Sequence, residues 1–160
     1  MGASTPPHSL NQIMYSVFPK LQSSPHRVTS PKTPDYNCIA WAAGEKTRFW
    51  APILADEYYW PTEIPSVVTV ETITEAFESL DYSVCEDGGD EAGYEKIAIY
   101  AKPSGEPTHA SKQVNKDKWS SKLGKDVDIE HEIDALNSDF YGQPVIFMKR
   151  PIREPEVSVE

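Results

Sequence analysis

The stretch Asn37-Cys38-Ile39-Ala40-Trp41-Ala42-Ala43-Gly44 decides the fold of this chain, because it contains the longest apolar run in the sequence. Asparagine is a good residue for capping the start of a helix, and glycine is a common residue at its end. The six residues between them are all apolar. A helix that is hydrophobic all round lies in the centre of a fold. We therefore predict a buried helix that begins at or just before Cys38.

The residues before this helix are more polar. A short helix is predicted over 9–22, and 23–36, with three prolines, is predicted to be an extended surface segment. The two ends, 1–8 and 151–160, are polar or rich in proline and have no hydrophobic period, so we expect them to be disordered. The rest, 9–150, has the length of one domain with its own core.

After the aromatic loop 47–65, the pattern changes to alternating strand signals with two further helices. A capping-box pattern at Thr72 and Glu75 and an apolar stripe predict a helix over about 70–80. Strands are predicted at 82–85, 95–102, 108–114, 119–124 and 145–149, and a last helix at about 128–138. Helices grouped before a run of hairpin-connected strands indicate an α+β fold, in which helices pack on a mostly antiparallel sheet.

The charge of the chain limits its partners. The formal net charge is -10, and no cluster of lysine and arginine is longer than a dipeptide. We therefore do not expect nucleic acid or anionic membrane surfaces as partners. We do expect a protein or peptide-like partner. No signal-peptide pattern opens the chain and no apolar run is long enough to span a bilayer, so we expect a cytoplasmic protein. Delivery by a specialised secretion route and the oligomeric state stay open.

Metal and cofactor sites are not predicted. Cys38 and Cys85 are the two cysteines, and with the four histidines they lack the spacings of a zinc site. A disulfide between them is not expected in a reducing compartment. The acidic loop 86–91 lacks the regular spacing of calcium ligands, so we expect it to be solvated. No nucleotide-binding glycine motif occurs, and no cofactor is expected.

Cys38 is the main candidate for chemistry. A thiolate is the reactive form of cysteine, and unpaired N–H groups at the start of a helix favour it. His109, at the start of a predicted strand, is the preferred general base, with Ser111 and Gln113 on the same face of that strand. An inert, buried Cys38 and a surface His109 are the structural alternatives. His131 is predicted on the polar face of the last helix.

Other candidates have supporting roles. A third residue that orients His109 could be Ser120, Asp126 or Asp128. Oxyanion donors could be the backbone N–H of Cys38 and the side chain of Asn37. The aromatic loop that follows the Cys38 helix could form a substrate groove, with these residues as its wall: Trp50, Tyr59 and Trp60.

The order of these blocks resembles the papain-like cysteine hydrolases. The blocks are Asn37–Trp41, Lys96–Tyr100 and Thr108–Ser111, and their order is similar to that of the bacterial NlpC/P60 cell-wall amidases. The resemblance implies a papain-like fold and a Cys38–His109 pair that hydrolyses or transfers an acyl group. In those amidases the base usually precedes the second block, where this chain has Glu95 and Lys96, so here His109 would act from the next strand.

A second resemblance covers most of the chain. It looks like an uncharacterised bacterial family, a domain of unknown function, through the blocks Tyr36–Ala42, Thr108–Gln113, Trp119–Gly124 and Phe147–Pro151. Two functions follow. The first is a cysteine hydrolase or acyl transferase acting on an amide or related bond. The second is a non-enzymatic protein-binding module (an interaction, immunity or accessory protein) on the same scaffold.

Overall fold

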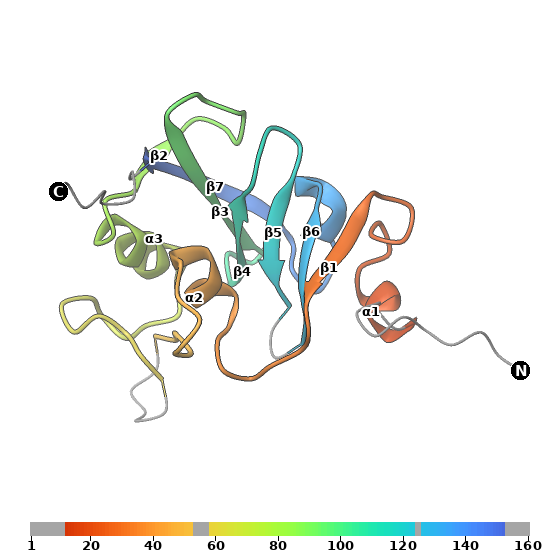
Figure 1. Cartoon of the computed structure of the whole chain (residues 1–160). Coiled ribbons are helices and arrows are strands. Elements are labelled where there is room, and N and C mark those ends of the chain that lie inside the picture. The colour runs from red at the N-terminus through yellow and green to blue at the C-terminus, as the bar shows by residue number, and fades with distance from the viewer. Residues whose placement is uncertain (1–11, 53–57, 124–125, 153–160) are drawn as a thin grey trace, which may run out of the picture.

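A computed structural model describes residues 12–52, 58–123 and 126–152 (Figure 1). Its helices are α1 (Gln12–Val17), α2 (Cys38–Ala43), α3 (Val70–Glu78) and the 3₁₀ helix η1 (Ile133–Leu136). Its strands are β1 (His26–Ser30), β2 (Ser83–Cys85), β3 (Tyr94–Ala101), β4 (Pro107–Gln113), β5 (Trp119–Lys122), β6 (Asp128–His131) and β7 (Gln143–Pro151). Helices and an antiparallel sheet confirm the predicted α+β class.

The strands form one seven-stranded sheet in the order β1-β6-β5-β4-β3-β7-β2. Each neighbouring pair is antiparallel. Strands β3, β4, β5 and β6 follow one another as a meander, which short turns make possible. The last strand, β7, returns to lie between β3 and the short edge strand β2. This return places β3 in the interior of the sheet, where residues 96–101 are all buried.

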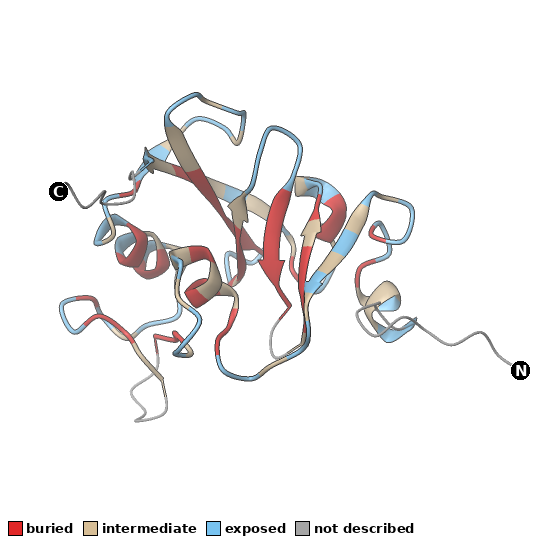
Figure 2. Ribbon diagram, in the orientation of Figure 1, coloured by how far each residue is buried: buried red, intermediate tan, exposed pale blue. Residues whose placement is uncertain are grey.

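Each face of the sheet carries its own core. Side chains of α2 and α3 pack with Ile97 and Ile99 of β3 on one face. The alternate residues Ala98 and Tyr100 face the opposite side, where side chains of α1 and η1 cover them. Figure 2 shows that the buried residues concentrate in the central strands and on the inner sides of α2 and α3. We call the face covered by α2 and α3 the α2 face, and the face covered by α1 and η1 the η1 face.

Most predicted elements are present, with one clear error. The segment 128–138 is not one helix but strand β6 followed by η1, because residues of β6 bond to β1 and β5. The extended segment 23–36 contains edge strand β1. Helix α3 begins one turn before the predicted cap, with Thr69 as N-cap and Thr72 as its capping-box partner. The predicted disordered end 1–8 lies outside the described residues, as does most of 151–160.

Candidate functional site

Cys38 is the first residue of α2, as predicted. The side-chain oxygen of Asn37 accepts from the N–H of Ala40 at 3.2 Å and from the N–H of Trp50 at 3.0 Å. Its side-chain nitrogen donates to the Trp50 carbonyl at 2.6 Å. Gly44, at φ 92°, ends the helix in the left-handed conformation that glycine adopts without strain. The Asn37 amide therefore ties the start of α2 to the loop at Trp50, and its role as an oxyanion donor stays a prediction.

The thiol of Cys38 lies against strand β4. Part of the residue reaches the surface, but burial around the sulfur raises the pKa of the thiol. Smaller effects lower this pKa: the backbone N–H groups of Ala110 and Ile39, and the positive charge of Lys122. The thiol is therefore protonated at neutral pH, with hydrogen-bond donors and a cation nearby that would favour the thiolate.

His109 is buried on the η1 face of β4, with 3% of its surface exposed. It lies opposite Tyr100 in the β3–β4 register, and its ring stacks on Tyr141 at 4.1 Å between centroids, with 13° between the planes. Its Nε2 is 2.9 Å from the hydroxyl of Ser121. Its Nδ1 is buried and has no hydrogen-bond partner among the described residues. Burial lowers the pKa of His109 well below its ordinary value, so the imidazole is neutral.

The two predicted partners meet β4 at consecutive residues but from different sides. The Cys38 thiol reaches the backbone N–H of Ala110 on the α2 face, whereas the His109 ring lies on the η1 face. Within the described residues no hydrogen bond joins the sulfur and the imidazole. Strands β4 and β5 pair only at Lys112–Ser120 and Gln113–Trp119. Beside His109, a side-chain hydrogen bond between His109 and Ser121 joins the two strands.

The three candidates for orienting His109 all have other partners. The Ser120 hydroxyl accepts from the Trp41 indole N–H at 2.9 Å, on the α2 face. The carboxylate of Asp128 accepts from the hydroxyl of Tyr36 at 2.7 Å. The carbonyl of Asp126 accepts from the buried ammonium of Lys122. Among the described residues none of these three bonds to His109.

The residue that does bond to His109 is Ser121, which the sequence analysis missed. The Ser121 hydroxyl is 2.7 Å from the Ser111 hydroxyl and 2.7 Å from Nε2 of His131. His131 belongs to β6 and is 1% exposed, so its predicted position on the polar face of a helix is wrong. The usable signal was the alternation of β4, which correctly placed Ser111 on the same face as His109.

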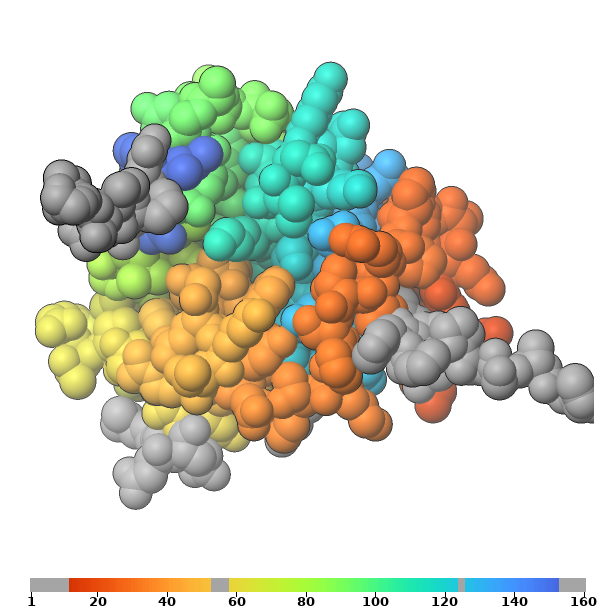
Figure 3. Space-filling model, viewed as in Figure 1, coloured from red at the N-terminus to blue at the C-terminus, as the bar shows by residue number. Residues whose placement is uncertain are grey.

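The predicted substrate groove is only partly present. Trp50 and Trp60 are buried in the core of the α2 face, with 5% and 9% exposed. Tyr59 lines a surface pocket of about 380 Å³ whose other walls are Pro34, Asp35, Thr47, Arg48, Phe49 and Tyr58. Pro34 and Asp35 lie just before α2 in the chain, so the pocket is close to the start of that helix. In Figure 3 the orange part of the chain, which includes α2 and the residues before it, lies on the face turned toward the viewer.

The comparison with known protein families identifies one match. Residues 27–149 match the family described as a domain of unknown function, DUF7689. The chain belongs to this family. It matches no curated protein and no solved structure. In the described part of the DUF7689 chain, no helix is both long and apolar enough to cross a membrane.

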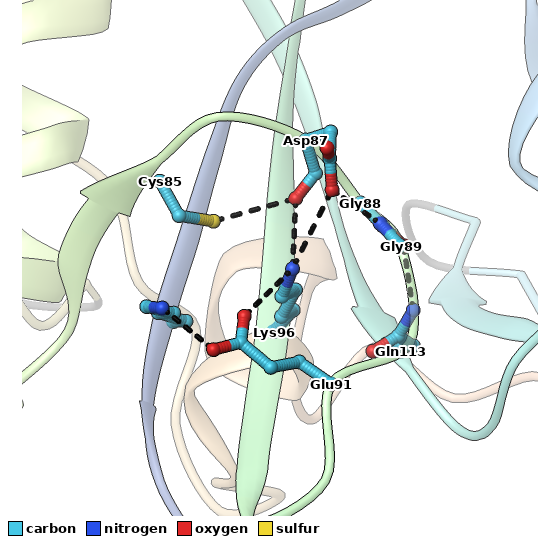
Figure 4. A network of polar contacts seen from close by, with 8 residues as sticks. Cys85, Asp87, Gly88, Gly89, Glu91, Lys96 and Gln113 are labelled. Atoms are coloured by element: carbon cyan, nitrogen blue, oxygen red, sulfur yellow. Dashed lines mark hydrogen bonds and ion pairs between the residues drawn. The ribbon is translucent and has the colours of Figure 1, made fainter.

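The acidic loop of the DUF7689 domain is organised by lysines (Figure 4). The nearly buried ammonium of Lys96 donates to the Asp87 carbonyl at 3.0 Å and lies 3.4 Å from the Glu91 carboxylate. Lys149 donates to the same carboxylate at 2.8 Å. Gln113 donates to the carbonyl of Gly88 at 2.7 Å. The loop is thus bound to the sheet by protein cations, and no metal-binding cluster is found among the described residues.

Proposed function

We propose that this domain is a papain-like cysteine hydrolase or acyl transferase that acts on an amide or related acyl bond. Cys38 is the nucleophile and His109 is the general base. The observation that carries the proposal is the buried Nδ1 of His109, which has no partner among the described residues although the same ring is fixed by Ser121 and Tyr141. Buried polar atoms are normally paired, and exceptions concentrate at functional sites.

The chemistry starts from two neutral groups, because burial raises the pKa of Cys38 and lowers that of His109. During attack the S–H bond breaks and a bond forms between sulfur and the acyl carbon. The proton passes to Nδ1 of His109, which becomes an imidazolium, and it then moves to the leaving nitrogen as the acyl–nitrogen bond breaks. Water or another acceptor, deprotonated by the same nitrogen, then attacks the thioester; the bond between sulfur and the acyl carbon breaks, and the proton returns to the sulfur. The ammonium of Lys122 favours negative charge at the sulfur before the bond forms.

This reaction requires the sulfur of Cys38 and the imidazole of His109 to approach each other. The approach would take place beside His109, where β4 and β5 are not paired through their backbones. Among the described residues, side-chain hydrogen bonds from Ser121 to His109 and Ser111 link the two strands there. The pocket at Tyr59, with its aromatic walls and Arg48, would hold a neighbouring part of a protein or peptide-like substrate.

A second candidate, the protein-binding module without catalysis, is favoured by a specific observation. The thiol and the imidazole lie on different faces of β4, and both are neutral in the resting state. In that case Cys38 and His109 are parts of two cores, and partners bind the half-buried aromatic side chains of the loop, Phe49, Tyr58 and Tyr59. A location in the cytoplasm stays a prediction under both functions.

The test is the formation of an acyl-enzyme. The full chain is incubated with an activated acetyl ester, and the acetylated residue is mapped by mass spectrometry. We expect acetyl on Cys38 in the wild type and in the control Cys85→Ser, and none in Cys38→Ala or His109→Gln. Cys38→Ala should keep the melting temperature within a few degrees of the wild type. Acetylation confined to surface lysines, or unchanged in His109→Gln, would reject the hydrolase.

A further inference from the structure

Four polar side chains form a hydrogen-bonded group on the η1 face of the sheet. They come from three neighbouring strands: His109 and Ser111 from β4, Ser121 from β5 and His131 from β6. Each is at most 3% exposed. Ser121 lies at the centre, 2.9 Å from His109 Nε2, 2.7 Å from His131 Nε2 and 2.7 Å from the Ser111 hydroxyl. We call this group the Ser121 network.

The direction of each hydrogen bond in the Ser121 network follows from the acceptor at its end, the carbonyl oxygen of Glu132. Nδ1 of His131 is 2.7 Å from the carbonyl oxygen of Glu132, and a carbonyl only accepts, so this nitrogen carries the hydrogen. Burial lowers the pKa of His131 to about 4, so the ring is neutral near pH 7 and has no second hydrogen. Its Nε2 is therefore an acceptor, and Ser121 donates its single hydrogen to it.

The hydrogen of His109 is placed by the same counting. A hydroxyl has one hydrogen and two lone pairs, and Ser121 has already used its hydrogen on His131. Its other two contacts must therefore donate to it, one from Ser111 and one from Nε2 of His109. A neutral imidazole carries one hydrogen, so Nδ1 of His109 has a lone pair. This result agrees with the finding that Nδ1 has no hydrogen-bond partner among the residues that the structure describes.

We infer that Ser121 and His131 are positioning residues that fix the hydrogen of His109 on Nε2 and keep Nδ1 as a free base. The role of that base rests on the proposed function, but the placement of the hydrogen does not. His131 matters because it takes the hydrogen of Ser121. Without an acceptor at residue 131, this hydroxyl can turn and donate to Nε2 of His109. The His109 hydrogen then moves to Nδ1, where it blocks the base.

The test measures the tautomer directly, by long-range proton–nitrogen NMR of the full chain labelled in its histidine rings. We expect hydrogen on Nε2 of His109 and on Nδ1 of His131 in the wild type. His131→Leu should populate the Nδ1–H form of His109. His131→Gln should restore the wild-type form, because its side-chain oxygen accepts from Ser121. Ser121→Thr, which keeps the hydroxyl, should also retain it, and His26→Gln controls for the loss of a histidine outside the network.

Alkylation of Cys38 in the same variants separates this inference from the proposed function. A base blocked in His131→Leu should slow alkylation roughly tenfold, with recovery in His131→Gln. If the tautomer follows this series while Cys38 stays unreactive in every variant, the inference stands and the hydrolase is rejected. If His109 carries its hydrogen on Nδ1 in the folded wild type, or keeps one tautomer in folded His131→Leu, the inference is overturned.

Discussion

Acid should destabilise this protein through His131, and the size of the effect can be worked out. The groups facing this ring are His26 across the β1–β6 pair, Ser121 of β5 and the carbonyl of Glu132, with His109 beyond Ser121. Burial is the main cause that lowers the pKa of His131 from 6.5 to about 4, and the charge of His26 lowers it further.

The sign follows from proton linkage. The unfolded chain binds a proton at residue 131 once the pH falls below 6.5, whereas the folded chain does so only near pH 4. The contribution to stability is therefore complete above pH 6.5 and is lost as the pH falls toward 4. Each unit of pKa shift corresponds to about 1.4 kcal/mol, so the loss from His131 totals about 3 kcal/mol. For a chain of this length that is roughly 6–12 °C in melting temperature.

The assay is urea unfolding followed by tryptophan fluorescence across this pH range, in the wild type and in His131→Gln. Glutamine can accept from Ser121 but does not titrate. As the pH falls from 6.5 toward 4, the free energy of unfolding of His131→Gln should therefore fall less steeply than that of the wild type, by about 1.4 kcal/mol per pH unit. Acid titration of carboxylates is common to both proteins and cancels. His26→Gln keeps both buried histidines and should lose nearly as much stability as the wild type, because burial is the larger cause of the lowered pKa of His131. If the unfolding free energies of the wild type and His131→Gln fall in parallel with pH, His131 does not cause the loss of stability in acid.

Two further predictions concern the framework around the site. Gly142→Ala should cost at least about 2 kcal/mol of unfolding free energy, because a Cβ there would overlap the Ala101 carbonyl oxygen. Gly105→Ala, also at positive φ but with open space around it, should cost about 1 kcal/mol in thermal unfolding. Asn37→Ala should lower the free energy of unfolding by about 3 kcal/mol, because it removes the helix cap and both bonds to the Trp50 backbone. Asn37→Ser should cost less, because serine can still cap the helix. Equal melting temperatures for the two variants would contradict this.

The helix at Cys38 could be predicted because its signals are local. Asn37 and Gly44 mark its two ends, and both act in the structure as their residue types suggest. The segment after Val127 was predicted wrongly for a physical reason. Ile129, Ile133 and Leu136 have helical spacing, but residues 128–131 gain more by pairing with β1 and β5. Such long-range pairing is not encoded in the local pattern.

The site was predicted only in part, since its geometry depends on strand register. The sequence indicated His109 as the base and placed Ser111 beside it, and both belong to the Ser121 network. The neighbours Ser120 and Ser121 could not be told apart, because a shift of one residue turns a strand side chain to the opposite face. His131 was missed because its burial exists only once β6 lies between β1 and β5.

The central claim is that Cys38 reacts with the help of His109, and its most direct test is the rate at which iodoacetamide modifies Cys38. The measurement uses the folded Cys85→Ser chain near neutral pH, with the labelled site mapped by mass spectrometry. We expect modification of Cys38 that slows roughly tenfold or more in Cys85→Ser/His109→Gln. A Cys38 that stays unmodified in the folded chain, or reacts equally fast with and without His109, would contradict it.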